Sequence, residues 1–450
     1  MNDTVLGDKR FGFPFLLMMT DLIFGTFRPD RLFPGGDVLK YFPVLLTFIL
    51  GLCWLASSGK VLHNKQTRYV LWFAALIALQ VPIARNRGLA FTELKSFAVF
   101  TVSSFLFKVQ FLDTPRKWEK FVRYAVILSP FLALVGIAHK GRIKIPALED
   151  ENDFALLMNT ILPVAFFLGQ EAESQAKKML YYGCALVAAA GTIVSFSRGG
   201  FVGLAAVGMY LLWRTPHRVT GSFAILALCL ALCVYAPASY WSEVESIEAQ
   251  NYQHGTGKER VESWEGGWKM FLDHPIIGVG AMNFGVWLPD YYPLDWKKNR
   301  MWGRVAHSLY FTILPEMGLI GTMLFVRILL YNRRTNRLIA KLEEDKGKLL
   351  AASSLPPSER EAMSRAIRTL YFISLAYKGA MIGFLVTGTF ISVFWYGYFW
   401  SITAAVVVTG NLARKLEDEI RAASRPGADG RVPEDTPVPV SDSLAKAAMP

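Results

Sequence analysis

Long stretches that are almost free of charge constrain this chain more than any other feature. Residues 41–56 and 180–196 contain no acidic or basic side chain. Of the 450 residues, 53% are hydrophobic and only 19% are charged, whereas soluble domains carry about 25% charged residues. A helix of roughly 20 apolar residues crosses the hydrocarbon layer, while a transmembrane strand needs only about 10. The composition therefore excludes an ordinary soluble protein and predicts an all-α, polytopic integral membrane protein.

The apolar windows, separated by charged or Gly/Pro breaks, predict about twelve spans. They are residues 11–27, 41–57, 69–84, 94–112, 121–138, 154–169, 179–197, 199–213, 220–237, 308–331, 369–388 and 391–410. The run 179–213 is too long for one crossing at about 1.5 Å per residue, and the sequence Ser-Arg-Gly-Gly at 197–200 lies in its middle. We therefore expect two helices joined by a tight turn there.

Charge between the spans predicts the orientation. Basic residues concentrate in the loops that are cytoplasmic when both termini are cytoplasmic, as the positive-inside rule requires; they include Lys60, Lys65, Arg68, Arg116, Lys117, Lys120, Lys177, Lys178, Arg214, Arg218 and a long basic loop at 332–368. The formal net charge of +12 then reflects topology, and nucleic acid is not an expected partner. One large outer loop, about 238–306, contains an amphipathic helix.

The membrane domain is expected to cover residues 1–410. The tail 411–450 begins as a charged helix and ends in a Pro-rich stretch of the kind that stays disordered. The first apolar run lacks a small-x-small cleavage site, so we expect an uncleaved span. All the cysteines lie in apolar segments and are interpreted as buried hydrophobes rather than disulfides or metal ligands; they are Cys53, Cys184, Cys229 and Cys233.

Three outer segments could carry chemistry, and the first is the turn at 195–200. Arg198 precedes Gly199 and Gly200, which open the next helix. The free N–H groups and dipole of a helix N-terminus favour an anion, and a guanidinium adds a rigid fork that suits phosphate oxygens. The alternative is a glycine turn between packed helices, with the arginine side chain extending to the membrane interface.

The second segment is residues 257–272 of the large loop. Its apolar side chains recur at helical spacing, which predicts an amphipathic helix lying flat on the membrane; they are Val261, Trp264, Trp268, Phe271 and Leu272. Tryptophan at that depth is usually an interfacial anchor. Arg260 precedes Trp264 by one turn and is a candidate second phosphate ligand.

The third segment is the mouth of the span after the large loop, where His307 stands three residues before Tyr310. A histidine at this level can act as a general base near neutral pH, although a lone histidine is more often structural. His254 and His274 share the loop, but their spacing supports a zinc site poorly. Glu316 is nine residues beyond His307, on the opposite face of a straight helix, so a direct dyad would need a kink at Pro315.

An acidic run at 149–153 opens the span 154–169 on the outer side. It could bind a divalent cation or cap a helix N-terminus, where carboxylates are favoured. We prefer the cap.

Together these segments resemble the O-antigen ligase superfamily, which also contains O-antigen polymerases and bacterial protein O-oligosaccharyltransferases. The resemblance rests on Glu-Asn-Asp at 151–153, Ser-Phe-Ser-Arg-Gly-Gly at 195–200, Glu-Arg at 259–260 with Trp268, His-Pro-Ile-Ile-Gly-Val-Gly at 274–280, His-Ser-Leu-Tyr at 307–310 and Glu-Met-Gly-Leu-Ile-Gly at 316–321. It covers about residues 150–330, while the first five spans match only in pattern.

The resemblance implies a glycosyltransferase of the bacterial inner membrane with its active site on the periplasmic side. Such an enzyme takes a glycan from undecaprenyl pyrophosphate and transfers it to a hydroxyl, in the ligase branch a sugar of lipid A-core, without a metal or other cofactor. By this resemblance Arg198 and Arg260 would hold the pyrophosphate and His307 would act on the acceptor. Further expected contacts to pyrophosphate or lipid are Gly199, Gly200, Arg85, Arg87, Trp264 and Tyr310.

No residue in the sequence decides between ligase, polymerase and protein glycosyltransferase. Outer basic residues such as Arg85, Arg87, Arg142 and Lys144 could meet the phosphates of lipid A-core, which favours the ligase. A lipid-linked glycan flippase or transporter is the alternative from another class. One dominant outer loop and no evident duplication of two halves favour a one-sided enzyme.

Overall fold

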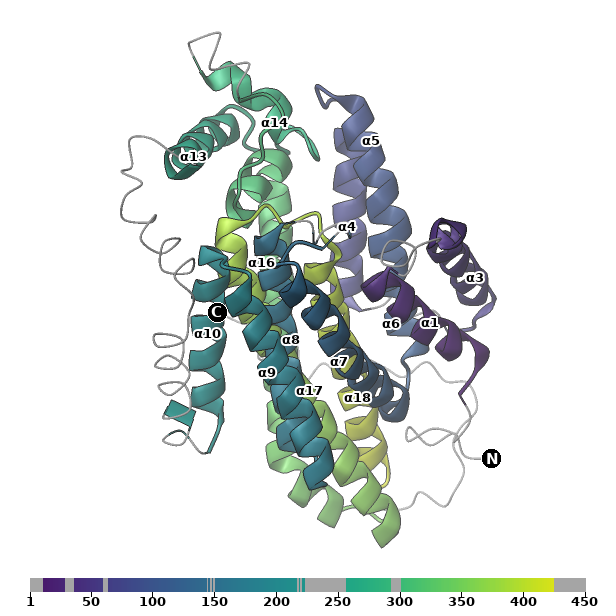
Figure 1. Cartoon of the computed structure of the whole chain (residues 1–450). Helices are drawn as coiled ribbons and strands as arrows, with labels where there is room; N and C mark the ends of the chain where they lie inside the picture. Colours follow the sequence, from purple (N-terminus) through teal and green to yellow (C-terminus); the bar gives the residue numbers. More distant parts are fainter. Residues whose placement is uncertain are drawn as a thin grey trace.

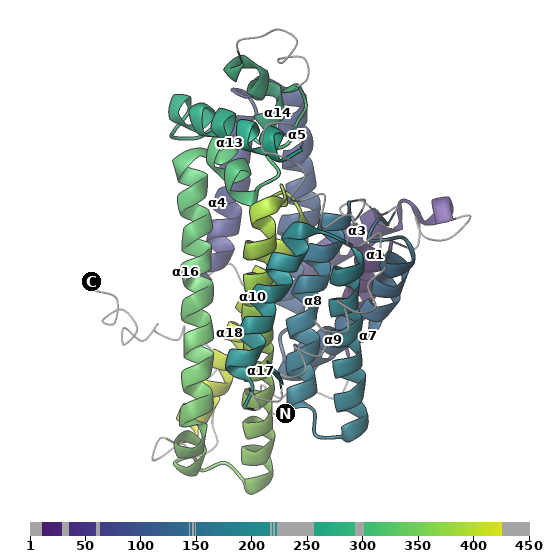
Figure 2. The ribbon, with the colours of Figure 1, turned by 60° about the vertical axis from the view of Figure 1, so that its left-hand side comes forward.

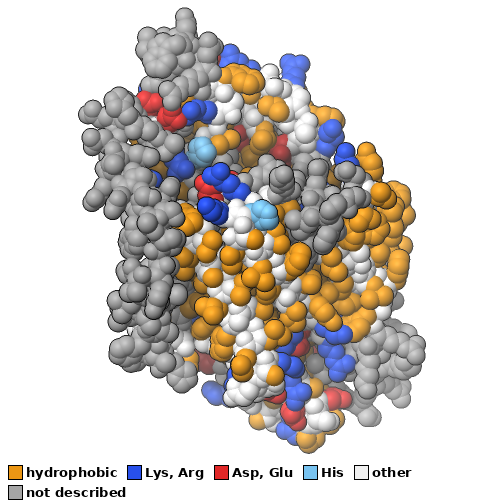
Figure 3. Space-filling model, in the orientation of Figure 1, with side chains coloured by type: hydrophobic (Ala, Val, Ile, Leu, Met, Phe, Trp, Pro, Cys, Tyr) orange, Lys and Arg blue, Asp and Glu red, His pale blue; other side chains and the backbone are white. Residues whose placement is uncertain are grey.

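The computed structural model of the chain is built from helices (Figure 1). It describes residues 11–28, 36–59, 64–143, 145, 148, 150–216, 218, 221–222, 256–292 and 301–424. Within these residues every regular element is a helix, which confirms the predicted class. A broad hydrophobic belt covers the middle of one face, with charged side chains gathered toward its two ends (Figure 3), as expected of a chain that spans a membrane.

The centre of the bundle is α8 (Glu151–Glu171), which packs against α7 (Pro115–Ala138), α9 (Gln175–Val194), α10 (Arg198–Arg214) and α17 (Pro357–Thr387). Asn159 of α8 is fully buried, and its side-chain amide donates to the Gly200 carbonyl at 2.9 Å and to the Thr387 hydroxyl at 3.1 Å. The Thr192 hydroxyl donates to the Asn159 side-chain oxygen at 3.1 Å. One buried amide thus joins four helices, because a polar group in an apolar interior must find its partners within the protein.

The predicted spans agree well with the helices. On the flank of the bundle lie α1 (Phe13–Phe27), α3 (Phe42–Ala56), α4 (Lys65–Gln80) and a continuous run of α5 (Arg87–Ser96), the π-helix η2 (Phe97–Val102) and α6 (Ser103–Phe111). Five of the described helical segments are long and apolar enough to cross a membrane. They are Arg87–Phe111, Pro115–Ala138, Glu151–Glu171, Leu309–Ala351 and Pro357–Phe390, with shorter apolar helices at Phe13–Gly25 and Phe42–Ala56.

Other sequence predictions also hold. The run 179–213 divides into α9 and α10 at the expected turn. Cys184 is buried and Cys53 half-buried, both as free thiols. Several expectations fall outside the described residues; these are most of the span 220–237, Lys60, Cys229, Cys233, His254, Lys144, Glu149 and the Pro-rich end of the tail.

The long basic loop expected at 332–368 is wrong. There α16 (Leu309–Ala351) and α17 continue as helices, joined only by residues 352–356. Lys, Arg and Glu are good helix formers, and ion pairs one turn apart add support, such as Arg365 with Glu361 at 2.9 Å. Likewise α18 (Gly397–Ala422) runs without interruption through the expected boundary at residue 410.

The large loop forms a small layer over one end of the bundle. Its helix α13 (Thr256–Asp273) lies across that end rather than along it (Figure 2), as expected for residues 257–272. It is followed by α14 (Phe284–Trp287) and the 3-10 helix η3 (Leu288–Tyr291). A separate core holds the layer together, made of Met270, Val279, Phe284, Leu288, Tyr292, Met301 and Ala306.

Candidate functional site

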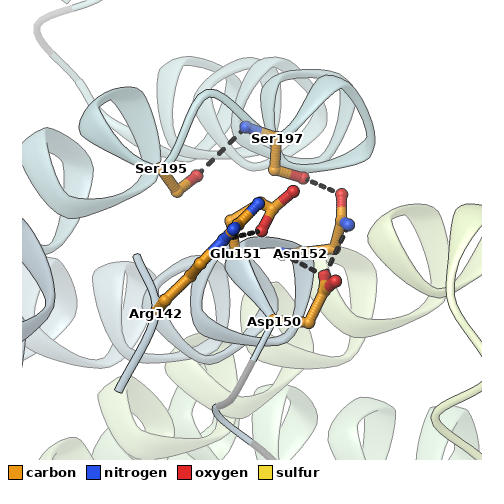
Figure 4. A network of polar contacts seen from close by, with 6 residues as sticks. All are labelled: Arg142, Asp150, Glu151, Asn152, Ser195 and Ser197. Carbon is orange, nitrogen blue, oxygen red and sulfur yellow. Dashed lines mark hydrogen bonds and ion pairs between the residues drawn. The ribbon is translucent and has the colours of Figure 1, made fainter. Parts of the chain in front are cut away.

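The turn between α9 and α10 is fixed by serine side chains. The Ser197 hydroxyl caps α10, accepting from the Gly200 N–H at 2.9 Å and donating to the Asn152 side chain at 2.7 Å. The Ser195 hydroxyl accepts from the Ser197 N–H at 3.2 Å (Figure 4). Arg198 is therefore the first residue of α10, directly after a side-chain cap.

Gly199 and Gly200 permit close packing around this turn. A Cβ on Gly199 would lie 2.9 Å from the Phe390 side chain, and one on Gly200 would lie 2.5 Å from Ala155. The N–H of Gly200, which could have met an anion, is used in the Ser197 cap. Packing thus accounts for both glycines, and a direct contact with pyrophosphate stays a prediction for them.

The acidic run caps α8, as the sequence predicted. Asp150 is the N-cap and accepts from the Asn152 backbone N–H at 2.8 Å and from its side-chain amide at 2.6 Å. Glu151 pairs with Arg142 at 2.8 Å (Figure 4), and this hydrogen bond raises the pKa of the exposed Arg142 guanidinium. Because Asn152 also binds Ser197, the start of α8 is joined to the turn that carries Arg198.

Helix α13 presents Arg260 to the same place. One turn later, the Trp264 indole N–H donates to the Ala306 carbonyl at 2.8 Å, and its ring stacks on Phe311 with centroids 5.3 Å apart. Trp264 therefore anchors α13 beside His307. Its assignment as a substrate contact stays a prediction. Next to Trp264 around the same helix, Val261, Trp268 and Leu272 remain exposed, consistent with a helix that rests on a membrane surface.

His307 directly precedes Ser308, the N-cap of α16, and part of the residue is exposed to solvent. Its backbone is left-handed, with φ of 49°, and Ser308 then caps the helix by accepting from the Phe311 N–H at 3.5 Å. A non-glycine residue in this conformation is uncommon and needs support from its surroundings. The Trp264 hydrogen bond to the preceding Ala306 carbonyl provides such support.

Arg260 lies within electrostatic reach of both Arg198 and His307. Burial lowers the pKa of Arg260, and the positive charge of Arg198 lowers it further, while the carboxylates of Asp150 and Glu151 oppose the shift. Burial and then the charge of Arg260 lower the pKa of His307, which Asp150 raises and Arg304 lowers. Since these effects require short separations, Arg198, Arg260 and His307 share one end of the bundle.

Two residues of this cluster were not singled out as site residues from the sequence. Arg304 pairs with Glu259 at 2.5 Å, next to Arg260, and Asp150 lies within electrostatic reach of both Arg260 and His307. Asp150 falls in the acidic run at 149–153, whereas Arg304 belongs to none of the motifs in the sequence. Only the folded chain shows which cations the carboxylate faces.

Of three other expected substrate contacts, two have partners within the protein. Arg85 pairs with Asp290 and lies over the Trp287 ring, 4.8 Å from its centroid. Arg87 is the exposed first residue of α5. The Tyr310 hydroxyl donates to the Leu385 carbonyl at 3.2 Å, which ties α16 to α17. The structure gives Arg85 and Tyr310 roles in joining elements, and their contact with substrate stays a prediction, as does that of Arg87.

Among the described residues, no group of three or more His, Cys, Asp or Glu side chains could hold a metal ion. The ionisable groups that do gather at the site are arginines, one histidine and the carboxylates that neutralise part of their charge.

These features define the class: a polytopic helical membrane protein with guanidinium groups and an imidazole clustered at one end of the bundle. Residues 183–326 match the family model described as O-antigen ligase, and this match supports membership of the O-antigen ligase superfamily, as the motifs predicted. The matched stretch contains Arg198, Arg260 and His307 and begins within α9, later than the residue 150 that the motifs suggested. No curated protein matches the chain.

Proposed function

We propose that this protein is an O-antigen ligase that transfers a glycan from undecaprenyl pyrophosphate to a sugar hydroxyl of lipid A-core. The observation that supports the proposal most is that Arg260, on the helix α13 that lies across one end of the bundle, is within electrostatic reach of both Arg198 and His307. In this proposal the site is on the periplasmic side of the inner membrane, both termini are cytoplasmic, and membrane lipid surrounds the belt.

The chemistry requires two kinds of group. Displacement of a lipid pyrophosphate from an anomeric carbon builds negative charge on the leaving phosphate, and the attacking hydroxyl must lose its proton. Arg198 and Arg260 can stabilise the first charge through bidentate hydrogen bonds to phosphate oxygens. His307 can accept the proton, since its lowered pKa keeps the imidazole neutral around pH 7.

A direct displacement of this kind inverts the anomeric centre. It also needs no metal ion, because the guanidinium groups supply the positive charge beside the leaving group. We therefore expect a metal-independent, inverting transfer, and a product that retains the donor's anomeric configuration would contradict the mechanism.

The test is glycan transfer by the purified protein in detergent, with an undecaprenyl pyrophosphate-linked glycan as donor and lipid A-core as acceptor. The wild type is run with and without a chelator, and His307→Ala is run in parallel at equal protein concentration. We expect transfer that survives the chelator and is lost in the variant.

The outcomes separate the candidate functions. Transfer to a growing glycan or to a protein hydroxyl, with none to lipid A-core, would favour an O-antigen polymerase or a protein O-oligosaccharyltransferase. Movement of the lipid-linked glycan across a bilayer without transfer would favour a flippase. Unchanged turnover by His307→Ala would remove the assigned base.

A further inference from the structure

Helix α16 is broken at Gly318, near the end of the helix bundle where the candidate site lies. Gly318 has φ of 60° and ψ of −164°, so the hydrogen-bond ladder of the helix is interrupted there. Residues 275–280 of the large loop replace the missing partners. Their bonds are Val279 N–H to Pro315 O at 2.9 Å, Gly280 N–H to Glu316 O at 3.1 Å, Leu319 N–H to Pro275 O at 2.8 Å and Ile320 N–H to Ile276 O at 3.1 Å.

Next to this break, the side chain of Glu316 binds two other segments, one at Phe284 and one at Trp395. Glu316 is only 3% exposed. One carboxylate oxygen accepts from the Phe284 backbone N–H at 3.0 Å, and the other accepts from the Trp395 indole N–H at 2.7 Å. The backbone N–H of Met282, two residues before Phe284, also donates to this carboxylate. All of these partners are pure donors, so both positions require an acceptor. No contact with His307 forms part of this arrangement.

The Phe284 bond leads to Arg260. Phe284 lies against α13, where a Cβ on Gly267 would be 2.9 Å from its ring. Gly267 is seven residues after Arg260 and three after Trp264, so the three share one face of α13. The hydrogen bond from Phe284 to Glu316 fixes Phe284 to α16, and this face of α13 packs against Phe284.

The Trp395 bond leads to Arg198. Trp395 belongs to the link between α17 and α18, residues 388–396, which also contains Phe390. The Phe390 side chain packs against Gly199, whose added Cβ would approach it to 2.9 Å. One oxygen of Glu316 therefore binds Phe284, which packs against the helix of Arg260. The other oxygen binds Trp395, in the link whose Phe390 packs beside Arg198.

We propose that Glu316 is a positioning residue that sets the separation of Arg198 and Arg260 for the two phosphates of a lipid diphosphate donor. The lipid diphosphate donor in this inference rests on the proposed function. The claim that Glu316 sets the separation of the two arginines does not. The carboxylate does not touch the reacting atoms; it fixes the layer of the large loop and the 388–396 link to one point of α16.

Glutamine at this position gives a sharp test. In Glu316→Gln the amide offers one acceptor oxygen and one NH₂ group to N–H donors on two sides, Met282 and Phe284 on one and Trp395 on the other, so on one side a donor faces another donor. An unsatisfied buried donor and a small misplacement of a charged group together lower turnover by about tenfold to a hundredfold. We expect this loss in kcat, with the KM for the donor changed by less than about threefold, and normal abundance in the membrane.

A second substitution should restore part of the activity. Trp395→Phe keeps an aromatic ring beside Phe394 but removes the indole N–H, and so removes the clash that Glu316→Gln creates. The double variant should therefore be faster than Glu316→Gln alone. Glu93→Gln is the matched control, since Glu93 lies close enough to Glu316 for their charges to interact but forms neither hydrogen bond. It should keep near wild-type kcat.

The geometric claim is measured without the reaction. Spin labels at Lys269→Cys on α13 and Val202→Cys on α10, in the full chain with its own cysteines replaced, report the separation of the two helices. We expect a broader distance distribution in Glu316→Gln and a narrower one in the double variant. An unchanged distribution in Glu316→Gln, or a double variant no faster than the single one, overturns the proposal. If no variant and no wild type transfers glycan, the proposed function fails while the distances still decide the role of Glu316.

Discussion

Two residues at the site have left-handed backbone without being glycine. Phe196, two residues before Arg198, has φ of 55°, and His307 itself has φ of 49°. Each such conformation costs about 1–3 kcal/mol and persists where the surroundings fix it. Here the surroundings are the serine caps that follow each residue, Ser197 and Ser308. The strained backbone thus lies at two positions of the candidate site, just before Arg198 and at His307.

The arginines give the first prediction. Arg198→Ala or Arg260→Ala should lower kcat/KM for glycan transfer by about 10²–10³-fold, roughly 3–4 kcal/mol, because each removes a fixed donor from developing phosphate charge. Lysine at either position should recover little of the loss, since an ammonium lacks the planar fork. Arg365→Ala, at an exposed pair with Glu361 in the opposite end, is the control for expression. Wild-type rates in both site variants would refute the assignment.

The pKa of His307 gives the second prediction. Catalysis needs the neutral imidazole, and burial together with the charges of Arg260 and Arg304 lowers this pKa. The rate should therefore hold down to a pH below the ordinary histidine value and fall as the pH drops through the lowered pKa. Arg304→Gln removes one of the lowering charges and breaks the ion pair with Glu259. Its acidic limb in kcat/KM should move to higher pH.

The opposite shift comes from Asp150→Asn. Asp150 raises the pKa of His307, so its neutralisation should move the acidic limb to lower pH. Asparagine caps helices as well as aspartate does, so the start of α8 should be preserved. Limbs that stay in place in both variants would show that another group governs the profile.

Sequence patterns could name Arg198, Arg260 and His307 because each stands at the outer mouth of a predicted helix. They could not show that the three lie near one another, since no local pattern encodes the proximity of segments that are 47 to 109 residues apart in the sequence. The roles of Trp264 and Tyr310 were missed for the same reason. Their hydrogen bonds go to the carbonyls of Ala306 and Leu385, and a backbone acceptor leaves no signature in the sequence.

At the scale of the elements, hydrophobicity predicted the positions of the apolar helices well. It did not predict where those helices continue as polar sequence. The windows ended α16 at 331 because apolar character ends there, but the helix continues to Ala351. Hydrophobicity measures which residues sit in lipid, whereas helix length also depends on propensity and packing. The motifs at 274–280 and 316–321 were visible as separate patterns, yet the structure shows that they bind each other.

This pairing gives the third prediction. Gly278 and Gly318 have φ of 72° and 60°, and a Cβ on either would lie 2.5 Å from backbone of the other segment. Gly318→Ala or Gly278→Ala should therefore destabilise the protein by more than about 1–3 kcal/mol, the cost of the backbone conformation alone. The measurement is thermal unfolding in detergent.

Gly347→Ala is the matched control on the same helix, because nothing lies within 4 Å of its added Cβ. An alanine inside a helix gains about 0.5–1 kcal/mol over glycine. A melting temperature that does not fall in Gly318→Ala, with Gly347→Ala behaving as expected, would show that the break in α16 is dispensable.

At the scale of the whole molecule, successive helices of the bundle run in opposite directions, so their connecting loops lie at one end of the bundle or the other. The starts of α8, α10, α16 and α18 share the site end with the ends of α7, α9 and α17. The other end holds the continuations of α16 and α17 and the basic residues that open α7, including Arg116 and Lys120. Both ends carry cations, but their local arrangement differs. The site cations are gathered around Asp150 and Glu151, whereas those of the other end follow long helical surfaces.

The fourth prediction follows from this sorting. The positive-inside rule counts basic residues near the membrane ends of short loops, so the end with residues 352–356 should face the cytoplasm and the end with α13 should face outward. Lys269→Cys on α13 and Ser354→Cys in the 352–356 turn, each in a cysteine-replaced chain, place exposed thiols at opposite ends. A membrane-impermeant maleimide should label the first in right-side-out vesicles and the second in inverted vesicles. The reverse pattern would put the arginine cluster on the cytoplasmic side, where a periplasmic acceptor could not reach it, and would exclude the proposed ligase even if each site residue proved essential.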